Sequence, residues 1–204
     1  PFLVASHGHT VFHQPEKGLT VQTGCGATMA SVTGIDTYCD FRVLDVAMGG
    51  QGAPLVPVGD RLLFSEYDAC INFGGIANIS YEQEDERIAY DVCPFNLLLN
   101  PLAEQLGVAY DDGGELASKG KVINELLSKL NACEYYSLSL PKSLGLEIIQ
   151  NDFLPLIIDT DYSTHDLMRT VVEHIAVVLS ELINRFGFKK VLVSGGGVYH
   201  SFLL

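Results

Sequence analysis

The chain has little basic charge, and this scarcity argues against one class of partner. It contains 12 Lys and Arg residues against 25 Asp and Glu residues, for a formal net charge of −13. Nucleic-acid binding requires a basic face that neutralises phosphates. We therefore expect no nucleic-acid partner. A phosphorylated ligand would have to be held by local devices such as backbone N–H groups, a helix N-terminus or a metal ion.

The sequence also lacks C-x-x-C pairs and long apolar runs. Its five cysteines are odd in number and widely spaced, which supports neither a zinc ribbon nor a disulfide framework. We expect most of them to be free thiols in a reducing compartment. No apolar run reaches about 18 residues, so no membrane span is predicted. These features predict a cytoplasmic protein.

The ends do not read like those of a complete protein. Pro1 is not an initiator Met, and the sequence stops at Leu204, soon after a glycine run that should lead into a helix. We therefore expect material to be missing on both sides. The residues present, 48% of them hydrophobic, suffice for one full core or two small lobes.

Strand patterns in the first half, followed by alternating strands and helices, predict an α/β fold. The boundary between two lobes is expected near residue 66, giving lobes of residues 1–66 and 67–204. Short apolar runs predict strands at 2–5, 11–13, 19–22, 35–39, 68–73, 76–81, 88–92 and 189–193. Helices are expected at 27–32, 57–63, from Asn96 as a capping residue, at 113–130 and at 166–186, with an exposed loop at 82–87.

Two glycine-rich segments follow predicted strands. Gly74 and Gly75 lie between two strands, and Gly195 and Gly196 follow a four-residue apolar strand. Such glycines either make plain turns or let a phosphate or a flat base approach the backbone. Neither segment fits G-x-G-x-x-G, which disfavours a dinucleotide-binding fold.

Three aspartates, Asp40, Asp45 and Asp91, are predicted close to strand ends. Sugar activation needs one carboxylate to accept a proton, and a second commonly organises magnesium through water. The plain alternative is that they cap strands. Arg42 lies between two of these acids and either forms an ion pair or clamps an anionic substrate.

Polar residues in two other segments have open roles. His7 and His9 share a face of an extended strand, as in a metal site, but neither H-E-x-x-H nor a Cys/His spacing is present. Hydrogen bonding is therefore favoured over metal ligation. Lys142 and Ser143 follow Pro141 in a loop, where they either reach a ligand or are solvated.

The order of these segments resembles the anhydro-N-acetylmuramic acid kinase family of the actin and sugar-kinase superfamily. The most specific block is Asp40-Phe41-Arg42, followed by Asp45-Val46-Ala47 and by Gly-Gly-Gln-Gly-Ala-Pro-Leu-Val-Pro at 49–57. The other matching segments are 6–15, 72–80, 141–143 and 195–197.

The resemblance implies a ribonuclease-H-like, two-lobed kinase fold with ATP and magnesium between the lobes. Such kinases open the anhydro bond of 1,6-anhydro-N-acetylmuramic acid, a small amino sugar, with water and phosphorylate the freed O6. This reaction serves cell-wall (peptidoglycan) recycling. We expect the protein to form a homodimer.

The resemblance also implies roles for individual residues. The catalytic aspartate falls on Asp91. From the aspartates discussed above, we expect Asp40 to hold magnesium through water. His7, Arg42 and Gln51 fall on positions expected near the sugar or the cleft, and we expect Lys142 and Ser143 to bind the substrate as well. Positions on the nucleotide side are Gly74, Gly75, Gly195 and Gly196.

The sequence departs from the family at two motifs and lacks a third. Asp-Thr-Gly-Pro-Gly-Asn reads here as Asp-Val-Cys-Pro-Phe-Asn at 91–96, where Phe95 is expected to narrow the pocket. Lys-Ser-Thr-Gly-Arg-Glu reads as Lys-Ser-Leu-Gly-Leu-Glu at 142–147, and the N-terminal Gly-Thr-Ser phosphate loop is absent. These changes keep a non-catalytic or chaperone-like nucleotide-binding protein open as an alternative, with a histidine-based metal hydrolase as a distant third.

Overall fold

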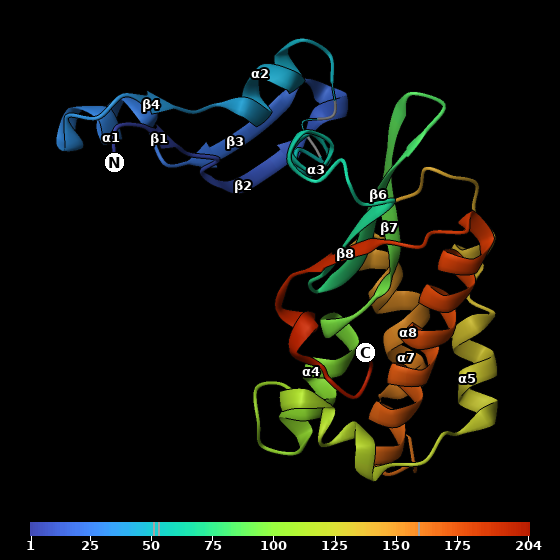
Figure 1. The fold of residues 1–204 in the computed structure, drawn as a ribbon. Helices are drawn as coiled ribbons and strands as arrows, with labels where there is room; N and C mark the ends of the chain where they lie inside the picture. Colours follow the sequence, from blue (N-terminus) through green and yellow to red (C-terminus); the bar gives the residue numbers. More distant parts are fainter. Residues whose placement is uncertain (51, 53, 159) are drawn as a thin grey trace. The chain divides into compact units, whose positions relative to one another are not determined.

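A computed structural model of the chain describes residues 1–50, 52, 54–158 and 160–204. The chain forms two compact units, Pro1–Val56 and Pro57–Leu204, which are drawn in Figure 1. The assignment of residues 1–66 and 67–204 to two kinase lobes remains a prediction.

Three consecutive strands, β5 to β7, are followed by a run of helices and then by the last strand. The strands are β1 (Val4–Ala5), β2 (His9–Gln14), β3 (Leu19–Thr23), β4 (Thr37–Tyr38), β5 (Ala69–Phe73), β6 (Ile76–Gln83), β7 (Glu86–Pro94) and β8 (Val191–Ser194). The α-helices are α1 (Gly26–Thr33), α2 (Phe41–Ala47), α3 (Val56–Leu63), α4 (Asn96–Gln105), α5 (Asn124–Asn131), α6 (Leu146–Ile148), α7 (Leu154–Ile157) and α8 (Thr164–Phe186). Short helical turns are η1 (Pro15–Lys17), η2 (Asp112–Gly114), η3 (Ala117–Lys119), η4 (Glu134–Ser137), the π-helical η5 (Ile149–Phe153) and η6 (Gly196–Tyr199).

The unit Pro1–Val56 contains two small sheets. β1 pairs with β4 in parallel, and β2 pairs with β3 as an antiparallel hairpin. Pro15 begins the connecting turn and Gly18 ends it in the left-handed conformation, as their backbone preferences predict. Helix α1 likewise ends at Gly34, at a φ of +67°.

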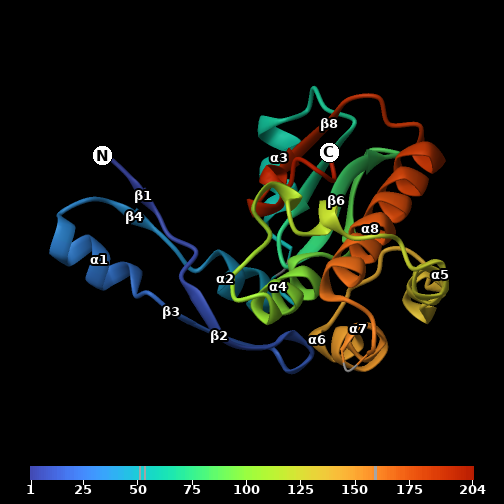
Figure 2. The ribbon, with the colours of Figure 1, turned by 90° about the horizontal axis from the view of Figure 1, so that it is seen from below.

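The unit Pro57–Leu204 is built on one four-stranded sheet of order β7-β6-β5-β8. β8 runs parallel to β5, and the other neighbours are antiparallel. Helix α8 contacts β7 and packs against α4 and α5, and both ribbon views show α5 on the outer side of α8 (Figures 1 and 2). The mixed sheet with its packed helices confirms the predicted α/β class.

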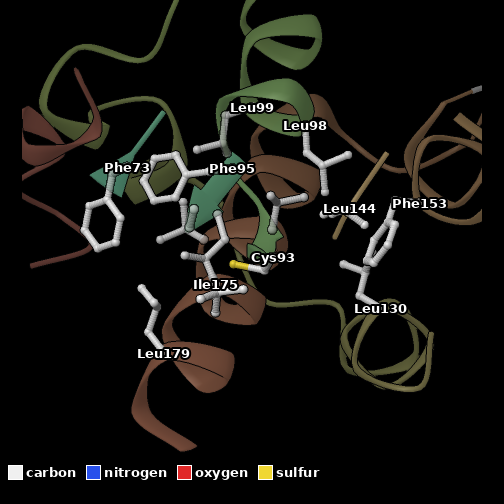
Figure 3. Close-up of a cluster of buried hydrophobic side chains, with 14 of the residues drawn as sticks. Phe73, Cys93, Phe95, Leu98, Leu99, Leu130, Leu144, Phe153, Ile175 and Leu179 are labelled. Atoms are coloured by element: carbon white, nitrogen blue, oxygen red, sulfur yellow. The ribbon is translucent and has the colours of Figure 1, made fainter. Parts of the chain in front are cut away.

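A single hydrophobic cluster fills this second unit (Figure 3). It joins the inner faces of the sheet to the apolar stripe of α8, whose periodicity correctly predicted this helix. Ser163 begins α8 by accepting a hydrogen bond from the Asp166 N–H. None of the described helices is both long and apolar enough to cross a bilayer.

The predicted loop at 82–87 is wrong, because β6 and β7 continue almost to its centre. Only Glu84 and Asp85 form the turn, with φ of +51° and +66°. This geometry suits a tight hairpin whose twist matches the flanking strands. One of the charged side chains in this segment, that of Glu82, forms an ion pair with Arg61 at 2.9 Å.

Two helix predictions are also wrong. The segment 113–130 breaks into short turns before α5, because Gly113 and Gly114 have φ of +62° and +81° and the Asp111 carboxylate accepts the N–H groups of Leu116 and Ala117. Asn96 does not cap α4: the N-cap residue is Phe95, and no side-chain hydrogen bond closes that end.

Candidate active site

Asp91 lies at a bulge in β7. Ala77 of β6 faces Cys93, whereas the next residue, Asn78, faces Asp91, so Val92 is an extra residue in the β7 strand. A bulge interrupts the strict alternation of side chains and re-aims one of them. Val92 and Cys93 are consequently both buried, while Asp91 remains half-buried.

One oxygen of the Asp91 carboxylate is held and the other is free. Oδ2 accepts hydrogen bonds from the Leu144 N–H at 2.8 Å and from the Ser143 hydroxyl at 3.2 Å. Oδ1 has no hydrogen-bond partner in the part of the chain that the structure describes. The structure thus brings together two predicted site residues, Asp91 and Ser143, which are 52 positions apart.

Both glycine segments follow the carboxyl ends of neighbouring strands, on the same side of the sheet. β5 and β8 are parallel, so their carboxyl ends are adjacent, and these ends carry Gly74 and Gly195. Gly195 has a φ of +88°, and a Cβ there would overlap Asn72 Oδ1 and lie 2.7 Å from the Phe73 carbonyl oxygen. Ligands of open α/β sheets bind outside the carboxyl ends of parallel strands.

The turn at Gly74 and Gly75 is fixed to the start of α4. The Gly75 carbonyl accepts the N–H groups of Phe95 at 2.9 Å and Leu97 at 3.0 Å, and the Gly74 carbonyl accepts that of Asn96. Three stretches of the chain that are far apart in sequence therefore meet here: the end of β5, the junction between β7 and α4, and the residues after β8.

A pocket of about 380 Å³ opens beside Gly196. Its lining residues are Asn96, Leu99, Asn100, Tyr110, Asp111, Asp112, Gly113, Gly196, Gly197, Tyr199 and His200. Asn100 Oδ1 and both ring nitrogens of His200 are buried without a hydrogen-bond partner among the described residues. Burial lowers the pKa of His200 despite the opposing effect of Asp111. Sequence reasoning missed these polar residues, although the closeness of His200 to the glycine run was a usable signal.

His7 and Arg42 meet in the first unit. Arg42 Nη2 lies 3.1 Å from His7 Nε2, and because a guanidinium can only donate, the ring nitrogen is the acceptor. A Cβ at Gly52 would lie 2.7 Å from Arg42 Cγ, so the glycine makes room for the arginine. Gln51, predicted to lie near the sugar, is outside the described residues.

Asp45 was expected close to a strand end but lies within α2. Its Oδ2 accepts the Gly52 N–H at 2.6 Å, and a Cβ at Gly50 would overlap this carboxylate. Asp45 therefore shapes the glycine loop and is not free to bind a ligand through that oxygen.

Asp40 is exposed, just after β4, and its Oδ2 accepts a hydrogen bond from the Cys39 thiol at 3.2 Å. The described residues contain no group of three or more His, Cys, Asp or Glu side chains able to hold a metal ion, so the histidine-based hydrolase has no ligand set there. A single exposed carboxylate does fit magnesium, which keeps most of its waters and needs only one or two carboxylates beside substrate phosphates.

The comparisons with known proteins agree with these motifs. The family model described as "Anhydro-N-acetylmuramic acid kinase" matches residues 2–204. The chain belongs to this family. Proteins named anhydro-N-acetylmuramic acid kinase from Aliivibrio fischeri, Vibrio parahaemolyticus and Legionella pneumophila (strain Lens) are 40%, 38% and 34% identical to it. Each alignment covers 98% of this chain but only 57–58% of the relative, so the chain spans less than two thirds of their length.

The similar solved structures are more distant. An activator of the 2-hydroxyisocaproyl-CoA dehydratase from Clostridium difficile with bound ADPNP is 13% identical, with a TM-score of 0.41 over 98% of this chain and 81% of that chain.

The departures from the family motif after Asp91 lie in the core. Cys93 and Phe95 are fully buried, and burial raises the pKa of the Cys93 thiol to about 12. The expectation that Phe95 narrows a pocket is wrong, because its ring stacks on Phe73 at 4.9 Å between centroids and does not line the pocket beside Gly196. Leu144 is also buried, at 2% exposure. These substitutions change core packing and leave the Asp91 carboxylate accessible.

Proposed function

We propose that the protein containing this chain is an ATP-dependent sugar kinase. It would convert 1,6-anhydro-N-acetylmuramic acid to N-acetylmuramic acid 6-phosphate, with hydrolytic opening of the anhydro ring, in peptidoglycan recycling. The observation that carries the proposal is the Asp91 carboxylate, anchored through Oδ2 with Oδ1 left unpaired. Membership of the family supports the substrate and the reaction.

Asp91 would act as the general base. Its free oxygen takes a proton from the water that attacks the anomeric carbon, and the bond between that carbon and O6 breaks. The released O6 then attacks the γ-phosphorus of ATP, and ADP leaves. A positioned base of this kind typically contributes 10²–10⁴-fold to the rate.

The glycines that follow the carboxyl ends of β5 and β8 would bind the nucleotide. Gly74, Gly75, Gly195 and Gly196 let phosphates and the nucleoside approach the backbone, and the pocket beside Gly196 has room for the nucleoside. Asp40 would hold magnesium through water. Bound there, the ion would supply charge neutralisation of the phosphates.

Arg42, Gln51 and Ser143 would contact the sugar. Arg42, oriented by His7, would clamp the carboxylate of the muramic acid, a pairing for which guanidinium geometry is suited. We assign Gln51 and Ser143 to sugar contacts as well. We also expect the protein to be cytoplasmic and a homodimer.

The test uses the full-length protein with ATP, magnesium and 1,6-anhydro-N-acetylmuramic acid. We expect a 6-phosphorylated sugar and one ADP per product, measured by mass spectrometry and a coupled ADP assay. ATP hydrolysis without a phosphorylated sugar would reject the kinase and favour a non-catalytic or chaperone-like nucleotide-binding protein.

A further inference from the structure

Lys142 is already bonded within the protein. Its Nζ donates to the carbonyl oxygens of Tyr135 at 2.8 Å and Tyr136 at 3.4 Å. The same ammonium lies 4.3 Å from the centroid of the Tyr135 ring. Burial, with a smaller effect of Arg185, lowers the pKa of Lys142. A lysine held this way is poorly placed to reach for a sugar.

The same segment surrounds Asp91. The Lys142 carbonyl accepts the Asp91 N–H at 3.1 Å, and the Leu144 N–H binds Asp91 Oδ2. The Tyr135 hydroxyl donates to the Asp91 carbonyl oxygen at 2.5 Å. Asp91, the segment 142–144 and Tyr135 therefore form a closed set of contacts.

Two residues of this set, Tyr135 and Leu144, are fixed by core packing. Tyr135 and Leu144 are each 2% exposed, and Figure 3 draws Leu144 in the same buried cluster as Leu98 and Phe153. The Lys142 ammonium links the segment 142–144 directly to η4 through its bonds to Tyr135 and Tyr136. Among the described residues, no other hydrogen bond joins 142–144 directly to η4; the remaining polar route runs through Asp91 itself.

We propose that Lys142 is a positioning residue for Asp91 and not a sugar ligand. By tying 142–144 to Tyr135 and Tyr136, it holds the Ser143 hydroxyl and the Leu144 N–H on Oδ2 and leaves Oδ1 for the reacting water. This inference rests on the proposed function, in which Asp91 is the base. It replaces the substrate-binding role that we expected for Lys142 from the sequence.

The first test compares Lys142→Met with Lys119→Met in the full-length enzyme. Met keeps the apolar stem but removes the donors, and Lys119 is an exposed lysine of the same unit. We expect Lys142→Met to lower kcat about 10–100-fold, because small misplacements of a catalytic group cost up to about 10² in rate. The KM for the sugar should stay within about twofold, and Lys119→Met should change neither. A KM raised more than tenfold with kcat unchanged would overturn the proposal.

The second test does not require activity and therefore separates this proposal from the proposed function. Amide hydrogen exchange is measured at Asp91 and Leu144 in the same variants. We expect Lys142→Met to accelerate exchange at these two amides at least tenfold while α8 is unchanged. Equal acceleration everywhere, or none, would contradict a positioning role.

A milder variant covers the case in which Lys142→Met does not fold. Tyr135→Phe removes only the hydroxyl that binds the Asp91 carbonyl. It should lower kcat and speed exchange at the Asp91 and Leu144 amides in the same pattern, by about 3–10-fold (about 1 kcal/mol for one hydrogen bond). Unchanged kcat and exchange would reject the proposal.

Discussion

In residues 57–204, the candidate site is built on a sheet and a continuous hydrophobic cluster. In residues 1–56, the described residues that are buried are Gly26, Val46 and Gly52. His7 and Arg42 meet there through an exposed hydrogen bond, and the absence of a side chain at Gly52 makes room for Arg42. Asp91, by contrast, is held by hydrogen bonds from Tyr135 and Leu144, which are both buried.

This difference matches the roles that we propose. A general base must be held in a precise geometry, which requires neighbours whose own rotamers are locked by packing. Ligand-binding side chains tolerate more freedom, because the ligand itself completes their contacts. We therefore expect mutations in the second unit to affect folding and turnover, and those in the first to affect mainly binding.

The largest contrast between the units should come from two phenylalanines. Phe95 is fully buried and stacked on Phe73, whereas Phe12 is 45% exposed. We expect Phe95→Ala to lower the free energy of unfolding by about 3–5 kcal/mol, because it leaves a cavity. Phe12→Ala should cost less than about 1 kcal/mol. Urea unfolding of the full-length variants measures both, and equal losses would break the contrast.

A smaller effect should appear on acidification, through His174. This residue is fully buried on α8, with Tyr136 Oη 2.7 Å from Nε2 and Asn131 Oδ1 2.5 Å from Nδ1. Burial lowers its pKa from 6.5 to about 4. As the pH falls below 6.5, His174 takes up a proton in the unfolded chain but not in the folded chain until about pH 4. The neutral, buried His174 therefore contributes its full stability above pH 6.5, and this contribution is lost progressively between pH 6.5 and pH 4.

The matching variant is His174→Gln, which removes the titrating group. Between pH 7 and pH 5, the wild type should lose about 2 kcal/mol more unfolding free energy than the variant, since each pKa unit is worth about 1.36 kcal/mol. Parallel pH curves for the two proteins would show that His174 does not carry this dependence.

The smallest effect on stability should come from Arg42→Lys in the first unit. We expect less than about 0.5 kcal/mol, because the contact with His7 is exposed. A lysine cannot reproduce the forked geometry that binds a carboxylate, so KM for the sugar should rise about tenfold, or about 1.4 kcal/mol. An unchanged KM would remove Arg42 from the sugar site.

Local patterns predicted much of this fold. The hairpin 68–81, the turn at Gly18 and helix α8 follow from glycine placement and apolar periodicity. The break in 113–130 was missed because it depends on where the Asp111 carboxylate points, which the hydrophobic spacing does not show.

The sequence indicated candidate site residues but not the contacts between them. Motif order identified Asp91 and Ser143 as candidates. It did not reveal the bulge at Val92, because register is set by the partner strand. Nor did it reveal the bonds from Lys142 to Tyr135 and from Tyr135 to Asp91, which arise only when the chain folds back on itself.

The most direct test of Asp91 as the base is a pair of variants, Asp91→Asn and Asp152→Asn, in the full-length protein. Asp152 is an exposed aspartate of the same unit, and none of the described hydrogen bonds uses its carboxylate. The rate of 6-phosphorylated sugar formation should fall about 10²–10⁴-fold for Asp91→Asn and stay within twofold for Asp152→Asn. Full turnover by Asp91→Asn would contradict the account.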